Sequence, residues 1–469
     1  MITLSKIIRL AFVGLFALTA GLHAEDAVVN LRVDPSTVLS RISEDFIGFG
    51  YESSAVAQSN FFCASNFVMT RLYRNLSPHG LIRVGGNVSD HTRYVRNGVA
   101  VPKTEREVTL LNEGSLRNLG DFARGAGWKV MWGLNLGSGS KAEAVEEAQA
   151  VDAALGDRLQ SFEIGNEVDA LRRFDRKYDA YYSAFADDKA AIRAALPGAK
   201  FSGPDVIGNW MWITNFVIAE SSDMQLLTQH YYRGGAGNPA STLEKLLQRD
   251  ENWERRLGKL RQLCQSYKIA YRINEVNSYS GGGKAGVSDT FGSALWVLDF
   301  MFKVASFGGE GVNIETDVNQ LGFISHYSPI VHDPSGLCHV RPEYYGMLAF
   351  AMAGHGQLVD VTTGKTAINL STYATKDDSG QVWIIAVNKD FSRSADLRIG
   401  LPKGCRGADI FRLTAPAMQS KDHVSFAGAE VSEDGTWSPG PPEQKSAKAG
   451  TLPLSLPAAS AVVIKLRPE

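Results

Sequence analysis

The sequence predicts an α/β protein, a (β/α)8 TIM barrel with a C-terminal β-sandwich domain. Short apolar segments alternate with helical patterns eight times between Glu44 and Ala353. Strand then helix, repeated, builds a parallel sheet, and eight repeats favour a closed barrel. No dinucleotide-binding fingerprint follows the first strand, because GFGYES (48–53) lacks the third glycine. After Ala353 the pattern changes to short alternating strands between Gly, Pro, Asp and Ser clusters, which is typical of a sandwich.

The expected elements can be placed in chain order. Barrel strands are predicted at Asp45–Phe49, Leu81–Val84, Lys129–Leu134, Leu159–Ile164, Lys200–Ser202, Leu226–Gln229, Ile269–Ile273 and Val312–Ile314. Helices are predicted at Phe67–Ser77, Leu116–Gly127, Lys141–Leu155, Asp179–Leu196, Trp210–Ala219, Leu243–Tyr267, Phe291–Phe307 and Glu343–Ala353. The catalytic barrel is therefore expected at residues 41–353 and the sandwich at residues 354–469. The N-terminal strand segment, residues 25–40, is expected to join the sandwich.

The first 24 residues have the pattern of a secretory signal peptide. Lys6 and Arg9 precede an apolar run over residues 10–20, and small residues lead to Ala24. The run is shorter than the ~20 residues of a membrane-spanning helix. We expect cleavage near Ala24 and a secreted or periplasmic protein, without a membrane partner after cleavage.

Composition excludes some functions. The 469 residues are 44% hydrophobic and 21% charged, which is the balance of a folded globular protein. The net charge of -2 becomes -4 on cleavage (-2 minus 2), because residues 1–24 carry two basic and no acidic side chains. An acidic protein is not expected to bind nucleic acid. Disulfides and buried thiols remain equally open for the four cysteines, Cys63, Cys264, Cys338 and Cys405.

Two carboxylates end predicted barrel strands, where catalytic groups of such barrels lie. FEIGNEVD (162–169) ends the fourth strand with Glu167, and YRINEVNS (271–278) ends the seventh with Glu275. One such residue alone would be read as a solvated carboxylate. Two across the barrel mouth suit glycoside hydrolysis, in which one carboxyl protonates the leaving oxygen and the other attacks the sugar or activates water. A separation of about 5 to 5.5 Å, the spacing of retaining enzymes, is a hypothesis at this point.

Several motifs resemble glycoside hydrolase family 79, which contains bacterial β-glucuronidases and relatives of heparanase. They span the whole barrel and enter the sandwich: LIRVGGN (81–87), FEIGNEVD (162–169), LTQHYY (227–232), INEVNSYSGGGKAGVSD (273–289), GSALWVLDF (292–300) and RPEYYGMLAF (341–350). The resemblance implies a retaining double displacement on β-linked glucuronic acid, with Glu167 as acid/base and Glu275 as nucleophile. It also implies that Asn166 contacts the sugar 2-hydroxyl and that Tyr231 orients the nucleophile.

The same resemblance implies how the sugar is held. Tyrosine hydroxyls and backbone N–H groups of a glycine-rich loop bind the C6 carboxylate in the relatives, and Tyr279, Gly281, Gly282 and Tyr327 occupy similar places here. Successive backbone N–H groups can bind an anion without an arginine, although a GGG run can equally be a flexible turn. Glu52 and Asn87, which end the first two strands, match positions that contact sugar hydroxyls. The segment after the eighth strand, residues 312–330, departs from the relatives in its first half, which leaves the alignment of Tyr327 open.

Strand alternation places Glu163 deep inside the barrel, where a lone charge is costly and needs a partner. Arg83 and Arg272, within the second and seventh apolar runs, are the candidates, and Arg83 can also stabilise Glu275 as an anion. The sequence offers neither HExxH nor CxxC, and GGGKAG places alanine where a phosphate loop needs Ser or Thr. We therefore expect neither metal nor cofactor.

The sequence thus leads to an exo-β-glucuronidase that hydrolyses terminal β-linked glucuronic acid from oligosaccharides or polysaccharides. Two alternatives stay open: an endo-β-glucuronidase of heparanase type, and a catalytically inactive barrel that binds carbohydrate.

Overall fold

Eight parallel strands close into a barrel because a helix returns the chain to the same end after each strand. The computed structural model describes residues 27–96, 109–316, 323–333 and 336–468. In chain order the barrel strands are β2 (Gly48–Glu52), β3 (Leu81–Gly85), β6 (Lys129–Leu134), β7 (Leu159–Ile164), β8 (Phe201–Val206), β9 (Met224–Tyr232), β10 (Ala270–Asn277) and β11 (Gly311–Glu315). Pairing of β11 with β2 completes the ring. The expected signal peptide lies outside the described residues.

The helices that surround the barrel follow the strands in order. They are α1 (Phe67–Leu76), α3 (Glu113–Ala126), α4 (Lys141–Leu155), α5 (Tyr178–Ala195), α6 (Trp210–Glu220), α7 (Leu243–Leu247) with α8 (Glu251–Tyr267), α9 (Phe291–Ser306) and α10 (Pro342–Ala353). Local sequence sets their starts: the Ser140 hydroxyl accepts the N–H of Glu143, whose carboxylate accepts the N–H of Ser140, a capping box that begins α4. Shorter elements lie in the loops: η1 (Ser53–Ala55), α2 (Gly86–Ser89), β4 (Thr92–Tyr94), β5 (Thr109–Leu111), η2 (Gly156–Arg158), η3 (Arg172–Phe174), β12 (Ile330–His332) and β13 (Cys338–Val340).

The second domain is one ten-stranded sheet that curls around its own core. Its strands are β1 (Ala27–Arg41), β14 (Gln357–Thr363), β15 (Leu370–Lys376), β16 (Val382–Asn388), β17 (Ala395–Gly400), β18 (Cys405–Thr414), β19 (Ser425–Phe426), β20 (Glu443–Ser446), β21 (Thr451–Leu456) and β22 (Ser460–Pro468). Val29, Leu454 and Ile464, from distant parts of the sheet, belong to one buried apolar cluster. The predicted fold class is confirmed.

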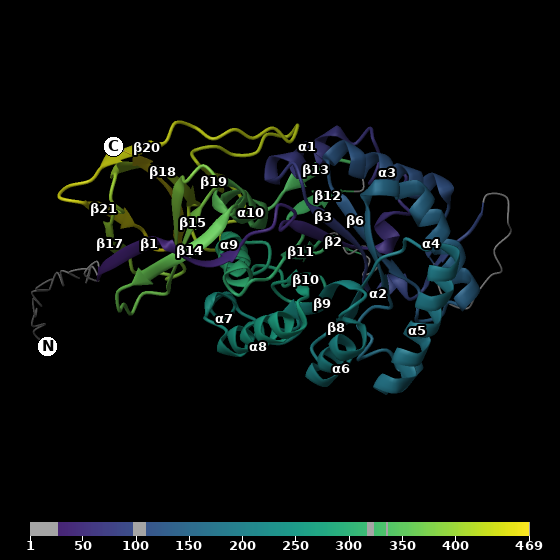
Figure 1. Ribbon diagram of the computed structural model, residues 1–469. Helices are drawn as coiled ribbons and strands as arrows, with labels where there is room; N and C mark the ends of the chain where they lie inside the picture. The colour runs from purple at the N-terminus through teal and green to yellow at the C-terminus, as the bar shows by residue number, and fades with distance from the viewer. Residues whose placement is uncertain (1–26, 97–108, 317–322, 334–335, 469) are drawn as a thin grey trace, which may run out of the picture.

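The N-terminal strand β1 lies inside this C-terminal sheet. It pairs antiparallel with β14, matching Val33 with Val361, and parallel with β17, matching Leu31 with Ile399. Figure 1 shows β1 between these strands, and shows α9 and α10 between the sheet and the barrel. Both helices contact β16, and α9 also contacts β1. The two domains therefore share a packed boundary.

Several predicted elements differ from the structure, mostly at their ends. The helix expected over Leu243–Tyr267 is two helices, because the Asp250 carboxylate accepts the N–H of Trp253 at 3.1 Å and begins α8 anew. The first barrel strand, expected to begin at Asp45, begins at Gly48. The fifth strand is expected to end at Ser202, because Gly203, Pro204 and Asp205 are residue types depleted in strands, but in the structure it runs to Val206.

Among the helices in the described part of the chain, none combines the length and apolarity needed to cross a membrane. Cys63 and Cys264 are buried in the folded chain.

Candidate active site

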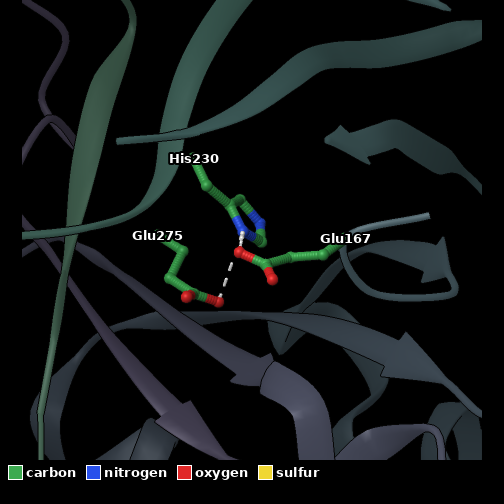
Figure 2. A group of neighbouring side chains, drawn as sticks. All are labelled: Glu167, His230 and Glu275. Carbon is green, nitrogen blue, oxygen red and sulfur yellow. Dashed lines mark hydrogen bonds and ion pairs between the residues drawn. The ribbon is translucent and has the colours of Figure 1, made fainter. Parts of the chain in front are cut away.

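Glu167 and Glu275 meet at the carboxyl ends of the barrel strands. Glu167 follows β7 and Glu275 lies near the end of β10, and both line a cavity of about 650 Å³. An oxygen of each carboxylate lies within 4.8 Å of the other, and Figure 2 shows the two carboxyl groups facing one another beside His230. This separation suits direct attack on a sugar, because a pair that activates water between its members stands about 6.5 to 9.5 Å apart.

Glu275 is held as an anion. Arg83 Nη1 donates to its Oε2 at 2.7 Å, and the Tyr232 hydroxyl donates to its Oε1 at 2.8 Å. Burial alone would raise the pKa of Glu275, but His230, Arg83 and Tyr232 outweigh burial and lower this pKa below its usual value. An ionised, partly desolvated carboxylate is suited to act as a nucleophile.

Arg83 connects Glu275 to the barrel interior. Its guanidinium is fully buried and also donates to Glu163 at 3.1 Å, to Asp205 at 2.7 Å and to the Asn166 amide oxygen at 2.7 Å. The partner expected for Glu163 is thus Arg83. The other candidate, Arg272, instead donates to the Asn313 side chain and to backbone carbonyls.

The two carboxyls beneath Arg83 titrate as a pair. Burial and the neighbouring Asp205 raise the pKa of Glu163 well above its usual value. Burial opposes ionisation of Asp205 too, but Arg83 and His230 lower its pKa. We assign the proton to Glu163 and the charge to Asp205, an arrangement that leaves Arg83 fully compensated.

Replacing Arg83 with methionine should lower the free energy of unfolding by about 3–5 kcal/mol, because it leaves buried carboxylates without their cation. Urea denaturation followed by tryptophan fluorescence measures this change. Arg41→Met is the matched control, since the Arg41–Asp378 pair is exposed and its loss should leave the midpoint unchanged. A wild-type midpoint for Arg83→Met would show that the buried network contributes nothing to stability.

His230, on β9, lies between the two catalytic candidates. Its Nδ1 is 3.3 Å from Glu167 Oε1 and 3.5 Å from Glu275 Oε2, and its Nε2 is 3.6 Å from Asp205 Oδ1. Burial alone would lower the pKa of His230, but Glu275 and Asp205 outweigh burial and raise it well above its usual value. A protonated imidazole stabilises the anionic form of Glu275 beside it.

Glu167, His230 and Glu275 are also residue types that bind divalent metals. The guanidinium of Arg83 and the cationic imidazole already place two positive charges beside Glu275. The Arg83 guanidinium already pairs with Glu275 at 2.7 Å, and this arrangement fits acid–base chemistry.

The prediction that Tyr231 orients the nucleophile is wrong, and Tyr232 takes that place. Alternate residues of a strand point the same way, so Tyr232 shares the inward face of β9 with His230. Tyr231 lines the cavity too, but its ring is directed toward the helices. The Tyr231 hydroxyl donates to Asp250 at 2.8 Å. Its ring packs on Trp253, with ring centroids 4.1 Å apart.

Tyr232→Phe should reduce kcat/KM by about tenfold or more, the loss of one hydrogen bond to a charged group. This hydrogen bond lowers the pKa of Glu275, so without it that pKa rises and the acidic limb of the pH profile moves to higher pH. The profile of kcat/KM from acid to neutral pH measures both effects. Tyr231→Phe is the matched control and should keep the wild-type limb. An unchanged limb in Tyr232→Phe would contradict the assignment.

The candidate hydroxyl-binding residues lie on one side of the cavity. Glu52 and Asn87 line it directly. Asn166 is buried beside them: its amide nitrogen donates to Asn87 Oδ1 at 3.2 Å, and its oxygen is held by Arg83. Burial raises the pKa of Glu52 to about 8, although the N–H of Val88 donates to its carboxylate. Glu52 is therefore able to donate a hydrogen bond as well as accept one.

Three of the four candidate carboxylate-binding residues lie at the cavity. Gly281, Gly282 and Tyr327 line the cavity. Tyr279 is buried away from it, and its hydroxyl donates to the Thr242 carbonyl at 2.8 Å. The prediction that Tyr279 binds the sugar carboxylate is wrong, because its hydroxyl instead joins the β10–α9 loop to the segment before α7.

Sequence reasoning missed four residues of the site: Asp205, His230, Tyr232 and Glu315. A signal existed for His230 and Tyr232, which occupy alternate positions in LTQHYY. Glu315 ends β11 and lines the cavity, as Glu52 does from β2. The rule that polar residues end barrel strands would have found it.

Comparison with known proteins identifies the second domain and finds relatives over a larger part of the chain. A model of the Glycosyl hydrolase family 79 C-terminal beta domain matches residues 349–463. A protein named β-glucuronidase from Aspergillus niger is 26% identical over 320 residues, covering 59% of this chain and 57% of that protein. A β-glucuronidase from Neurospora crassa is 28% identical over 384 residues, covering 69% and 66%. The chain thus spans less than two thirds of the length of these relatives.

Solved structures share the whole architecture. The 4-O-α-L-rhamnosyl-β-D-glucuronidase from Fusarium oxysporum 12S has a TM-score of 0.77 at 18% identity, covering 93% of this chain and 100% of that one. A family 51 α-L-arabinofuranosidase from Bifidobacterium longum has a TM-score of 0.70 at 12% identity, covering 94% and 99%. At these identities the likeness shows the fold alone.

Proposed function

The chain belongs to glycoside hydrolase family 79, and from this premise we propose that it is a retaining, exo-acting β-glucuronidase. One observation carries the proposal: two carboxylates face each other within 4.8 Å, and the one on β10 is held as an anion by Arg83 and Tyr232. A pair of unlike carboxyls at this spacing is what double displacement at a sugar requires.

In the first step Glu275 attacks the anomeric carbon. A carbon–oxygen bond forms to its carboxylate while the glycosidic bond breaks, and Glu167 gives its proton to the leaving oxygen. In the second step Glu167, now a carboxylate, takes a proton from water, and the water oxygen displaces Glu275. The sugar leaves with its original anomeric configuration, and both carboxyls return to their starting states.

The uronic acid specificity rests on the relatives and on the cavity. Both curated relatives are named β-glucuronidases. Gly281 and Gly282 have positive φ angles of 77° and 82°, and their N–H groups have no hydrogen-bond partner among the described residues. N–H groups of this kind are suited to a carboxylate.

Exo action is supported by the continuity of one cavity wall. The N–H of His326 donates to the Gly282 carbonyl at 2.6 Å, which joins the glycine loop to the segment carrying Tyr327. Such a continuous wall accommodates the sugar at the end of a glycan chain. Ile207, Trp253 and Arg256 line the remainder of the cavity and are available to the aglycone. We further propose, from the N-terminal sequence alone, that the enzyme is exported.

The first experiment compares hydrolysis of p-nitrophenyl β-D-glucuronide with that of the β-glucoside and the β-galactoside. We expect turnover of the glucuronide alone, and proton NMR should show the β-anomer as the first product. Cleavage of the neutral sugars instead would overturn the uronate specificity, and the α-anomer would overturn retention. Internal cleavage of an end-labelled uronic acid polymer would establish the endo alternative.

A further inference from the structure

Glu315 is a buried carboxyl in the cavity that the proposed chemistry does not use. It ends β11 and is only 2% exposed. Its Oε2 is buried without a hydrogen-bond partner among the described residues, although the side chain lines the cavity. That oxygen lies against Gly50 of β2, but the side chain to which it belongs lines the cavity. Buried polar atoms are rarely left unsatisfied, so this carboxyl is available to pair with ligand.

Glu315 lies on the side of the cavity that holds the glycine loop. The Asn277 amide donates to the backbone carbonyls of both Glu315 and Tyr327, at 2.9 and 3.1 Å, and so fixes the two residues side by side. The Tyr327 segment is joined in turn to Gly282 by the N–H of His326. Glu315, Tyr327 and the N–H groups of Gly281 and Gly282 therefore form one contiguous group, which we call the uronate cradle.

The groups facing Glu315 come from four strands and one loop. Two are acidic: Glu275 on β10 and Glu52 on β2. The others are Arg83 on β3, His230 and Tyr232 on β9, and Tyr327 in the loop after β11. Arg83 is already shared among other carboxylates.

The balance of these groups keeps Glu315 neutral. Burial, and then the charges of Glu275 and Glu52, raise the pKa of Glu315 well above its usual value, and Arg83 and His230 offset only part of this rise. The carboxyl is therefore an O–H donor under conditions where an ordinary glutamate is an anion.

Glu52 is the other acid with this property, but it lies elsewhere in the site. Its Oε2 already accepts the N–H of Val88 at 2.7 Å, on the side of the cavity formed by α2. Among the two acids, Glu315 is the one fixed beside the glycine loop.

We propose that Glu315 acts in the uronate cradle as a neutral carboxylic acid that donates its proton to the C6 carboxylate of the substrate. This inference rests on the proposed function, because it assigns one residue of the same site to the sugar carboxylate. A neutral donor can bind the substrate carboxylate next to the two other acids, Glu275 and Glu52, without adding a cation that Glu275 would attract. Ionised Glu315 would repel the uronate instead, so binding is coupled to one proton.

The sign of the coupling follows from the charges. The bound uronate adds a negative charge next to Glu315, so the pKa of Glu315 in the complex lies above that in the free enzyme. Below the free-enzyme pKa the group is already protonated, and affinity is independent of pH. Above it, binding takes up one proton, and affinity falls about tenfold per pH unit.

The test uses phenyl 1-thio-β-D-glucuronide, which resists hydrolysis, and the matching thioglucoside, which lacks the carboxylate. Isothermal titration calorimetry across pH 5 to 9, in two buffers of different ionisation enthalpy, gives both the affinity and the number of protons taken up. With the thioglucuronide, we expect wild-type proton uptake to be absent where Glu315 is already protonated and to rise toward one above its free-enzyme pKa. With the thioglucoside we expect none at any pH. Glu315→Gln keeps a donor but cannot titrate, so it should bind the thioglucuronide without proton uptake and with affinity independent of pH.

Each of the other outcomes contradicts one part of the proposal for Glu315. Proton uptake that persists in Glu315→Gln assigns the coupling to another group, and equal uptake with the thioglucoside assigns Glu315 to a hydroxyl. If Glu315→Gln does not fold, as judged by circular dichroism, the wild type alone decides: absence of proton uptake at the alkaline end of the range, together with equal affinity for the two thioglycosides, refutes the inference. Failure of the proposed function is distinguishable, because the wild type would then neither hydrolyse p-nitrophenyl β-D-glucuronide nor bind the thioglucuronide.

Discussion

Glu275→Ala should abolish hydrolysis of p-nitrophenyl β-D-glucuronide, with a loss of kcat on the order of 10⁴-fold or more, as when a covalent nucleophile is removed. The reason is positional: Arg83 and Tyr232 both donate to this carboxylate and hold it in the cavity. Added azide should restore turnover, because a small anion can enter the space left by the side chain. The product should be the α-glucuronosyl azide, which NMR distinguishes from the β-anomer.

The control for this experiment is Glu44→Ala. Glu44 is an exposed carboxylate that precedes β2, at the opposite end of the barrel from the cavity. It should keep wild-type kcat and show no response to azide. Full activity in Glu275→Ala, with a folded protein, would refute the nucleophile, and a β-azide product would assign Glu275 to acid/base catalysis instead.

Glu167→Gln should slow hydrolysis by an amount that depends on the leaving group. Loss of a general acid costs about 10² to 10⁴-fold when the leaving oxygen is a sugar hydroxyl. p-Nitrophenolate leaves with little help, so its release should be impaired far less, and the second step should become rate-limiting. Stopped-flow measurement should then show a burst of p-nitrophenol, with a low KM because the glycosyl-enzyme accumulates.

The matched comparison is Glu275→Gln, which should show no burst with any substrate. Azide should rescue Glu167→Gln through the β-glucuronosyl azide, the opposite anomer to that of Glu275→Ala. An equal loss for p-nitrophenyl and disaccharide substrates, without a burst, would show that Glu167 is not the acid.

Much of the scaffold could be predicted because it follows from periodic patterns. The strands Lys129–Leu134 and Leu159–Ile164 and the helix Lys141–Leu155 have the predicted bounds. Capping residues mark the ends of the helix, with Ser140 before it and Gly156 after it. The positions of Glu167 and Glu275 at the barrel mouth follow from the same patterns, as does the need of Glu163 for a buried cation. The patterns left Arg83 and Arg272 open as that cation, and the structure selects Arg83.

The remaining site residues depend on departures from regular strands. Pairing of β10 shifts register between Ile273 and Val276, and the adjacent residues Asn274 and Glu275 both reach the barrel interior. Asp205 has a φ of 57° within β8, beyond the reach of a period-two rule. Side-chain alternation within β9 does distinguish Tyr232 from Tyr231, but only once the inward position of His230 is known. Tyr279 could not be placed, because its direction depends on the path of the loop toward Thr242.

The position of β1 in the C-terminal sheet also determines the order in which the two domains fold. The first described residues of the chain, from Ala27, pair with strands that end at Thr363 and Gly400. This sheet therefore cannot close until nearly the whole chain has left the ribosome, while the barrel segments between its strands are already complete. Contacts of such long sequence separation form slowly, because a long loop must be closed before they stabilise anything. We expect refolding in two phases, an early one in the barrel and a late one when β1 pairs between β14 and β17. Until it pairs, β1 is the part of the nascent chain most exposed to aggregation.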